Sequence, residues 1–219
     1  MRAVVLFARS PEREAAAKRM SSAAPLFRAV IAAWLRAAHA HGALPLMACE
    51  PRDRESLAAI APRCERAWIE QQPVPFGTRV ADAASAAFVL GFDAVILAAI
   101  DAPPADLGTA FDALERGVAV IAPARDGGVN FIGLTSPNRA LLEQLAPRRR
   151  DLVALCREQL RDLLVLDTTT DVDSPQALEA AKRERAWRGF FSASSFPMPR
   201  LHHVQSGVMR HLPSRAPPA

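Results

Sequence analysis

Residues 93–100 of this chain read DAVILAAI, and this stretch decides the fold. It is almost wholly apolar, which is typical of a strand buried on both faces of a parallel sheet. Residues 107–116 then have a helical pattern, and residues 118–122 form a second apolar run. The order of strand, helix and strand predicts two parallel strands joined by a helix that covers one face of the sheet.

Strands and helices alternate in the same way along the first 125 residues. Short apolar runs predict strands at 4–7, 43–48 and 66–70, and helical spacing predicts helices at 23–40, 54–61 and 78–90. Further strands are expected at 129–134 and 163–166, and a last helix at 176–187. The pattern predicts an α/β fold with three layers (α/β/α) and a mostly parallel, doubly wound sheet.

Composition and charge exclude several functions. The chain has 219 residues, 50% hydrophobic and 23% charged, which is enough for one packed domain and an extension. It contains no tyrosine, so a mechanism that needs a tyrosyl acid or base is excluded. The net charge of +4 is too small to indicate nucleic-acid binding without clustering on one face. Charged helical stretches such as 12–14 and 183–185 are interpreted as solvated faces.

The cysteines and the N-terminus indicate where the protein works. Cys49, Cys64 and Cys156 are far apart and have no zinc-binding spacing, which argues against a disulfide framework and fits a reducing interior. The first apolar run is too short for a signal peptide or a membrane span. We therefore expect a soluble, cytoplasmic protein without a membrane partner.

The loops that follow the strands carry the candidate site residues, because ligands of such sheets bind beyond the carboxyl ends of the strands. The loop after the first strand is basic and contains Arg9, Arg13, Lys18 and Arg19. Arginine and lysine at this position bind phosphate groups, or they belong to a solvated loop and the start of a helix. Charge alone leaves both interpretations open.

Asp101 follows the apolar run at 93–100 directly. One interpretation makes it the N-cap of a helix that begins near Pro103 or Pro104. The other makes it a ligand of a divalent cation that faces a diphosphate, since Mg²⁺ is commonly held by carboxylates and substrate phosphates.

Two later loops contain further carboxylates. Asp126, Gly127 and Gly128 follow the strand at 118–122 and precede Asn130, and the two glycines suit a tight turn or close approach of backbone to a ligand. Residues 167–175 contain three aspartates, which is more than one helix cap needs. Ser174 or Asp173 is expected to cap the last helix, with Pro175 in its first turn.

Four segments in this order resemble a known family: VVLFARSP, FGTRVADA, VILAAIDAPP leading to APARDGGVNFIGL, and DVDSPQALEAA. Over roughly residues 3–185 the chain is similar to small bacterial glycosyltransferase-like proteins of the type associated with arsenosugar biosynthesis. These belong to the nucleotide-diphospho-sugar transferase superfamily with the GT-A fold, which also includes molybdenum-cofactor nucleotidyltransferases. The resemblance implies a transferase that uses Mg²⁺ or Mn²⁺, a nucleoside-diphosphate sugar and a small-molecule acceptor, with no nucleic acid.

The resemblance also implies roles for individual residues. It assigns Arg9, Arg13, Lys18 and Arg19 to the diphosphate, and Gly77 and Arg79 to the base and sugar-phosphate. Asp101 corresponds to the family's metal-binding aspartate. Asp171 and Asp173 are the candidate metal ligands of a late motif, and one of them supplies the second ligand. The resemblance assigns Asp126, with Asp101, to catalysis, and it assigns Gly127, Gly128 and Asn130 to the sugar or acceptor.

The first loop departs from the family pattern. Glu14 stands where glycine is expected and Ala17 where lysine is expected, with Lys18 one place further on. A nucleotidyltransferase that releases pyrophosphate is the alternative activity, and these two residues count against it. A non-catalytic nucleotide-binding relative is the third alternative.

The expected domain covers residues 1–187, and residues 188–219 form a C-terminal extension, expected to be structural or partly disordered. In the extension, His202, His203 and His211 lack the carboxylate or cysteine spacing of a metal site. Phe190, Phe191 and Phe196 are expected to pack on the domain or on a second subunit, which leaves a homodimer open.

Overall fold

The structure is a computed structural model that describes residues 1–61, 68–146 and 149–191. Cys64, Phe196 and the three C-terminal histidines named above lie outside the described residues. All statements below concern the described part of the chain.

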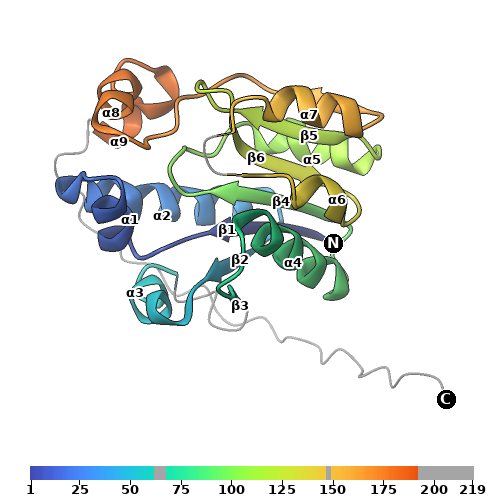
Figure 1. Cartoon of the computed structure of the whole chain (residues 1–219), viewed down its shortest axis with the longest axis horizontal. Helices are drawn as coiled ribbons and strands as arrows, with labels where there is room; N and C mark the ends of the chain where they lie inside the picture. Colours follow the sequence, from blue (N-terminus) through green and yellow to red (C-terminus); the bar gives the residue numbers. More distant parts are fainter. Residues whose placement is uncertain (62–67, 147–148, 192–219) are drawn as a thin grey trace.

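A seven-stranded sheet forms the centre of the described segments (Figure 1). Its order is β3-β2-β1-β4-β6-β5-β7, and β6 runs antiparallel to both β4 and β5 while the other neighbours are parallel. The strands are β1 (Arg2–Phe7), β2 (Leu44–Cys49), β3 (Trp68–Glu70), β4 (Ala94–Ala99), β5 (Ala119–Pro123), β6 (Val129–Leu134) and β7 (Leu163–Val165). The expected mostly parallel α/β sheet is confirmed.

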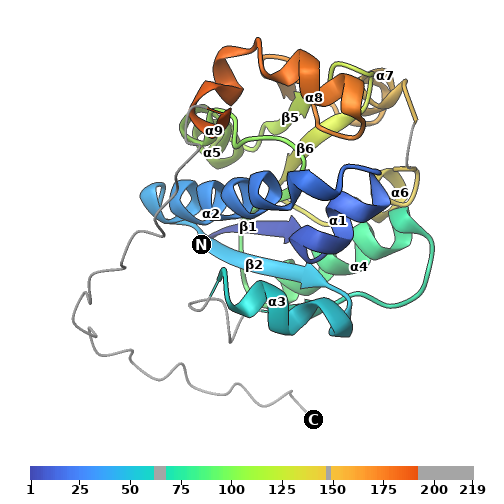
Figure 2. The ribbon, with the colours of Figure 1, turned by 90° about the vertical axis from the view of Figure 1, so that its left-hand side faces the viewer.

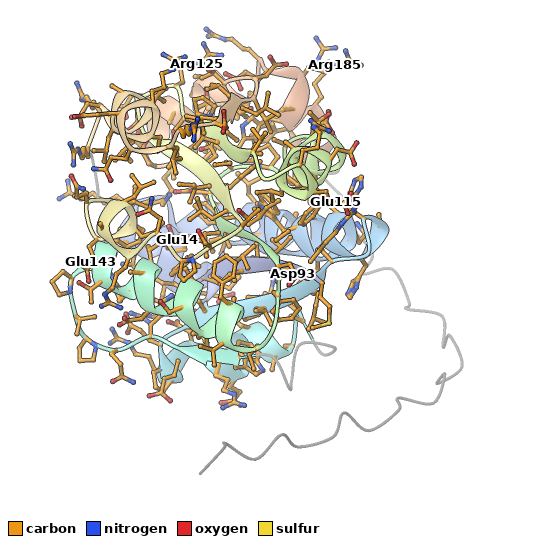
Figure 3. The ribbon with its side chains drawn as sticks, turned by 90° about the vertical axis from the view of Figure 1, so that its right-hand side faces the viewer. Glu14, Asp93, Glu115, Arg125, Glu143 and Arg185 are labelled. Atoms are coloured by element: carbon orange, nitrogen blue, oxygen red, sulfur yellow. The ribbon has the colours of Figure 1, made fainter. Side chains whose placement is uncertain are left out.

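Helices cover both faces of this sheet. The α-helices are α1 (Pro11–Ala17), α2 (Ala24–Ala40), α3 (Arg54–Ala58), α4 (Phe76–Val89), α5 (Leu107–Glu115), α6 (Arg139–Leu142), α7 (Leu152–Gln159), α8 (Pro175–Ala181) and α9 (Arg188–Phe191). Short 3₁₀ turns are η1 (Ser21–Ala23), η2 (Pro51–Asp53) and η4 (Arg185–Trp187). Figure 2 shows the face on which α1 and α2 lie, and Figure 3 shows the opposite face with α4 in front.

Two apolar clusters hold the three layers together. One contains Phe27, Trp34 and Phe111 and lies between the sheet and α2 and α5. The other contains Val80 and Leu141 and lies between the sheet and α4, α6 and α7. The central strand β4 supplies side chains to both clusters, and five of its six residues are buried. Its apolar sequence is therefore explained by burial on both faces.

The first loop folds differently from a plain loop. Residues 11–17 form α1, because Ser10 caps its N-terminus by accepting a hydrogen bond from the Arg13 N–H, and Pro11 occupies the first turn. The helix start that the sequence left open is thus confirmed. At the other end of the chain, the helix expected at 176–187 is shorter: α8 ends at Ala181 and η4 follows.

Two helix caps decide between the interpretations that the sequence left open for Asp101 and for Ser174 or Asp173. Ser174 caps α8 by accepting a hydrogen bond from the Ala177 N–H at 3.1 Å. Asp106, and not Asp101, caps α5 by accepting from the Thr109 N–H at 3.0 Å. The interpretation of Asp101 as the cap of a helix near Pro103 is therefore wrong, because no helix begins there and the chain stays irregular until Leu107.

Cys49 and Cys156 are buried free thiols, as expected without a disulfide framework. None of the helices in the described ranges combines the length and apolar composition that a bilayer crossing requires. Phe190 and Phe191 contact the buried ring of Trp187 at centroid distances of 5.5 and 5.9 Å, so the first residues after 187 pack on the domain.

Gly77 at the start of α4 gives the first testable prediction. A Cβ at this position would overlap the backbone carbonyl of Glu143, just after α6, so the Gly77→Ala change forces α4 and α6 apart. We expect it to lower the free energy of unfolding by about 1–3 kcal/mol, measured by urea denaturation. Gly189→Ala is the control, since a Cβ there meets nothing within 4 Å. Equal midpoints for the two variants would contradict the packing role of Gly77.

Candidate functional site

The predicted site residues lie at one edge of the sheet. Arg9, Asp101, Asp126 and Asp171 follow β1, β4, β5 and β7, which are parallel to one another and end at the same edge. The antiparallel strand β6 begins at this edge with Val129, which brings the turn between β5 and β6 there as well. Sheet topology therefore brings together residues from the loop after β1 and from the loop after β7, the last strand among the described residues.

Asp126, Asp171 and Asp173 form what we call the aspartate cluster. Each residue offers a carboxylate oxygen, and these oxygens lie within 4.8 Å of one another. Burial, followed by the negative charges of Asp101 and Asp126, raises the pKa of Asp171 from 3.8 to about 7. Ionising Asp171 is therefore unfavourable mainly because its carboxyl group is buried, and the neighbouring carboxylates add to this cost.

Asp101 lies next to the cluster but is paired with Lys18. Its Oδ2 accepts a hydrogen bond from the Lys18 Nζ at 2.5 Å, and its backbone carbonyl accepts from the Val172 N–H at 2.7 Å. The second bond joins the loop after β4 to the segment between Asp171 and Asp173. Asp101 thus adds negative charge beside the cluster while its own carboxylate has a cationic partner.

The ammonium group of Lys18 is buried and makes its contacts within the protein. Besides Asp101, it donates to the Val172 carbonyl at 3.0 Å and pairs with Glu14 at 3.2 Å, and its side chain is only 11% exposed. Burial acts to lower the pKa of Lys18, but the charges of Asp101 and Glu14 outweigh it, so this pKa is raised. Glu14, which departs from the family pattern, is buried, so its interpretation as part of a solvated face is wrong.

The arginines of the first loop divide into two groups. Arg13 pairs with the fully buried Asp53 and with Glu50, and Asp53 also accepts the Ser10 N–H at 2.9 Å. Asp53 is a structural anchor that sequence reasoning did not single out. Arg9 is half exposed with a 3.5 Å contact to Glu14, and Arg19 is exposed with a φ of 57°. Arg9 and Arg19 are therefore the cations of this loop that stay accessible to a ligand.

Arg79 lies in the first turn of α4, at the same edge of the sheet. Its Nη1 donates to the Gln71 Oε1 at 3.1 Å, and its guanidinium lies 5.6 Å from the centre of the Phe76 ring. Its Nε is buried and, among the described residues, has no hydrogen-bond partner. A buried donor of this kind is costly unless a ligand satisfies it. Gly77 next to it is explained by the close approach of Glu143, described above.

The turn between β5 and β6 needs its glycines for shape. Gly127 has a φ of 98°, and a Cβ on it would overlap the Arg150 carbonyl. The Gly128 N–H donates to the Asp126 Oδ1 at 2.8 Å, which orients that carboxylate. Asn130 is buried and donates to the carbonyls of Pro123 and Thr169 at 3.2 and 3.1 Å. Its amide N–H groups therefore join two loops of the site.

Sequence reasoning missed a group of residues near the C-terminal end of the described chain. Glu184 accepts hydrogen bonds from Arg125 and Thr170, and the Trp187 Nε1 donates to the Thr170 carbonyl at 2.8 Å. The interpretation of 183–185 as a solvated face is wrong for Glu184, because its side chain is 18% exposed. Trp187 was the available signal, since a large aromatic residue in a polar helix indicates a buried contact.

The donor set of the aspartate cluster fits a hard divalent cation. Its oxygens come from carboxylates alone, which Mg²⁺ and Mn²⁺ prefer over sulfur or nitrogen ligands. Burial and the neighbouring charges of Asp101 and Asp126 raise the pKa of Asp171, so a cation bound here would offset the cost of ionising this carboxyl group. Asp101 is the further carboxylate at this place, but Lys18 already neutralises it.

The pKa of Asp171 predicts how stability depends on pH when EDTA is present. The folded chain holds the Asp171 proton up to about pH 7, whereas the unfolded chain releases it near pH 3.8, so this residue lowers stability as the pH rises between these values. The slope for one group is at most about 1.4 kcal/mol per pH unit. We expect Asp171→Asn to remove this slope in denaturation experiments between these two pH values.

Asp167→Asn is the matched control for that experiment, because Asp167 is an exposed aspartate of the same loop outside the cluster. This variant should keep the wild-type slope. A slope that is the same in the wild type and in Asp171→Asn would show that Asp171 does not carry the raised pKa.

The Lys18 ion pairs predict a loss of stability on their removal. Lys18→Met leaves the carboxylates of Asp101 and Glu14 without their shared cation, which we expect to lower the free energy of unfolding by about 3 kcal/mol in EDTA. Lys182→Met is the control, since Lys182 makes an exposed pair with Glu179 and should cost less than about 0.5 kcal/mol. Similar losses in chemical denaturation would contradict the importance of the buried pairs.

Comparison with known structures supports the fold. A protein assigned as a nucleotide-diphospho-sugar transferase from Desulfovibrio desulfuricans G20 has a TM-score of 0.68 at 22% identity, covering 88% of this chain and 96% of that one. A protein assigned as a glucose-1-phosphate thymidylyltransferase from Bacillus anthracis has a TM-score of 0.53 at 10% identity, covering 83% and 94%. A mannose-1-phosphate geranyltransferase from Thermus thermophilus has a TM-score of 0.52 at 15% identity, covering 84% and 79%. At these identities the likeness shows a shared fold.

A search among curated proteins found no significant match. A family profile, described as an uncharacterized protein conserved in bacteria (DUF2064), matches residues 33–146, which is just over half of the chain. The matched region includes Gly77, Arg79, Asp101 and Asp126. The chain therefore belongs to the DUF2064 family and has the fold of nucleotide-diphospho-sugar transferases and nucleotidyltransferases.

Proposed function

We propose that this chain is a divalent-cation-dependent glycosyltransferase that moves a sugar from a nucleoside-diphosphate sugar to a small-molecule acceptor. The observation that carries the proposal is the aspartate cluster, in which carboxylates from two loops converge at the carboxyl edge of the sheet. In sheets of this kind that edge is the ligand-binding edge. The fold shared with nucleotide-diphospho-sugar transferases is consistent with this use of the edge.

Asp126, Asp171 and Asp173 are the proposed cation ligands. A Mg²⁺ or Mn²⁺ ion supplies positive charge that stabilises the leaving diphosphate. Asp101 remains beside the ligands, and its pairing with Lys18 gives the site one neutralised carboxylate. The ion then has three carboxylate ligands. The pair of Asp101 with Lys18 keeps the first loop fixed to the loop after β4.

Arg9, Arg19 and Arg79 are the proposed contacts of the nucleotide. Arg9 and Arg19 are the accessible cations after β1, and the buried Nε of Arg79 has no partner within the described ranges. Guanidinium groups suit phosphate oxygens because they donate two parallel hydrogen bonds. We assign Arg13 and Lys18 to holding the loop in place, since both are paired with protein carboxylates.

In the proposed reaction an acceptor hydroxyl attacks the anomeric carbon of the donor sugar. The bond between that carbon and the diphosphate oxygen breaks, the nucleoside diphosphate leaves, and the hydroxyl proton passes to the Asp126 carboxylate. Asp126, which is exposed as Asp173 is, lies on the β5–β6 turn, and the Gly128 N–H fixes one of its oxygens. We therefore assign it the orientation of the acceptor hydroxyl.

A nucleotidyltransferase is the main alternative, and the first loop argues against it. The residues of the first loop form helix α1, and the Glu14 carboxylate is buried there beside Lys18. This negative charge would repel the phosphates of a nucleoside triphosphate bound at the loop. A non-catalytic nucleotide-binding protein is the remaining alternative.

The test is a thermal-shift screen of nucleotide sugars and nucleoside triphosphates, each with and without Mn²⁺. A ligand that binds the folded chain raises its melting temperature by an amount that grows with affinity and concentration. We expect a Mn²⁺-dependent rise of several degrees with a nucleotide sugar, which is lost in Asp171→Asn and kept in the control Asp167→Asn.

Turnover of the ligand that shifts the melting temperature separates the alternatives. Release of a nucleoside diphosphate supports the glycosyltransferase, whereas release of pyrophosphate from a triphosphate supports the nucleotidyltransferase. Binding without turnover toward any acceptor class would favour the non-catalytic alternative, and no shift with any nucleotide would refute the proposed function.

A further inference from the structure

The aspartate cluster requires two loops that repel each other to stay close. Asp126 lies on the turn between β5 and β6, and Asp171 and Asp173 lie on the loop after β7. Backbone bonds bring the loops together: the Arg125 N–H donates to the Thr169 carbonyl at 3.2 Å, and the Thr169 N–H donates to the Pro123 carbonyl at 3.1 Å. These bonds end just before the aspartates.

A side chain from outside both loops joins them at that point. The Glu184 Oε1 accepts hydrogen bonds from the Arg125 Nε and Nη2 at 3.0 and 2.7 Å and from the Thr170 hydroxyl at 2.6 Å. Its Oε2 accepts the Thr170 N–H at 3.1 Å. Arg125 directly precedes Asp126, and Thr170 directly precedes Asp171. We call Glu184, Arg125 and Thr170 the loop bracket; Figure 3 labels Arg125 near the C-terminal helices.

Further contacts hold the residues of the loop bracket in place. The remaining polar group of Thr170, its carbonyl, accepts the Nε1–H of the fully buried Trp187, which fixes the chain just after Glu184. Burial acts to raise the pKa of Glu184, but the bonds from Thr170 and Arg125 outweigh it, so this pKa is lowered. Both oxygens of the ionised Glu184 carboxylate are therefore engaged in hydrogen bonds with the two loops.

We propose that Glu184 is a positioning residue of the cation site, which holds Asp126 and Asp171 at a distance where one ion binds both. This inference rests on the proposed function, because it presupposes that the aspartate cluster binds a cation. Glu184 does not touch the ion in this proposal; it acts through Arg125 and Thr170. The inference extends the site to the segment between α8 and η4, which the family match at 33–146 does not include.

The test measures Mn²⁺ binding to the purified full-length chain by calorimetry, after removal of metals with EDTA. Glu184→Gln keeps the size of the side chain but loses an acceptor that Thr170 and Arg125 require. We expect it to weaken Mn²⁺ binding about tenfold, the scale seen when residues that orient metal ligands are changed. Glu179→Gln, an exposed change in the preceding helix, should keep the wild-type affinity.

A second control distinguishes the positioning role of Glu184 from a purely structural role. Asp106→Ala removes the cap of α5 and lowers stability away from the cluster, so it should leave the Mn²⁺ affinity unchanged at a temperature where it is folded. If Asp106→Ala weakens binding as much as Glu184→Gln does, the effect comes from general destabilisation and the positioning role is refuted.

Arg125→Gln provides an independent test that does not depend on how well Glu184→Gln folds, because the Arg125 side chain is 60% exposed. It should weaken Mn²⁺ binding in the same direction, and the double variant should lose less than the sum of the two free-energy changes. Wild-type affinity in both single variants would overturn the inference while leaving the cation site in place. No Mn²⁺ binding by the wild type would remove the proposed cation site, and the positioning role with it.

Discussion

Repulsion among carboxylates at one edge of the sheet is the constraint on which the arrangement of this protein depends. Asp126, Asp171 and Asp173 converge within 4.8 Å, and Asp101 adds its charge to Asp171. Such a group is unfavourable unless surrounding bonds hold it. Lys18 of the first loop neutralises Asp101, and Glu184 joins the two loops of the cluster through hydrogen bonds with Arg125 and Thr170. Segments near both ends of the described part of the chain are thereby tied to the centre.

The sequence predicted the sheet well because the signals were local. An apolar run such as residues 93–100 indicates a buried strand wherever it occurs, and parallel strands place their following loops at one edge. The nearness of Asp126 to Asp171 follows from that rule together with the resemblance. The helix at 11–17 was also within reach, because Ser10 and Pro11 are typical of a helix start.

The ion pairs could not be predicted in the same way, because they depend on which side chains meet across the fold. Lys18 and Asp101 are 83 positions apart, and nothing in either neighbourhood indicates the other. Glu184 stands between two arginines, a pattern that is typical of a solvated helix, yet the turn after α8 directs it inward. Charged residues that are buried through pairing look like surface residues in a sequence, which explains why the interpretations of Glu14 and Glu184 were both wrong.

The first loop shows how one fold accommodates a change in its binding surface. Where the resembling family has glycine and lysine, this chain has Glu14 and Ala17 within a capped helix. The lysine next in sequence turns to Asp101 and is covered by Phe27, whose ring centre lies 5.5 Å from the Nζ. In the proposed function, arginines therefore make the contacts with the phosphate groups. Unlike lysine, arginine offers paired N–H donors in one plane.

Trp187 and Glu184 also affect when the site is assembled during synthesis of the chain. The ribosome delivers β1 to β6 and α2, α4 and α5 well before η4, although Trp187 of η4 belongs to the same apolar cluster as Phe27 and Trp34. The loop after β7 is bonded to Asp101, Pro123 and Arg125, but it receives its hydrogen bonds with Glu184 and Trp187 only when residues 184 and 187 have emerged. The site therefore gains the hydrogen bonds from Glu184 and Trp187 only after its other residues have been synthesised, and it cannot be complete before the chain has been made as far as residue 187.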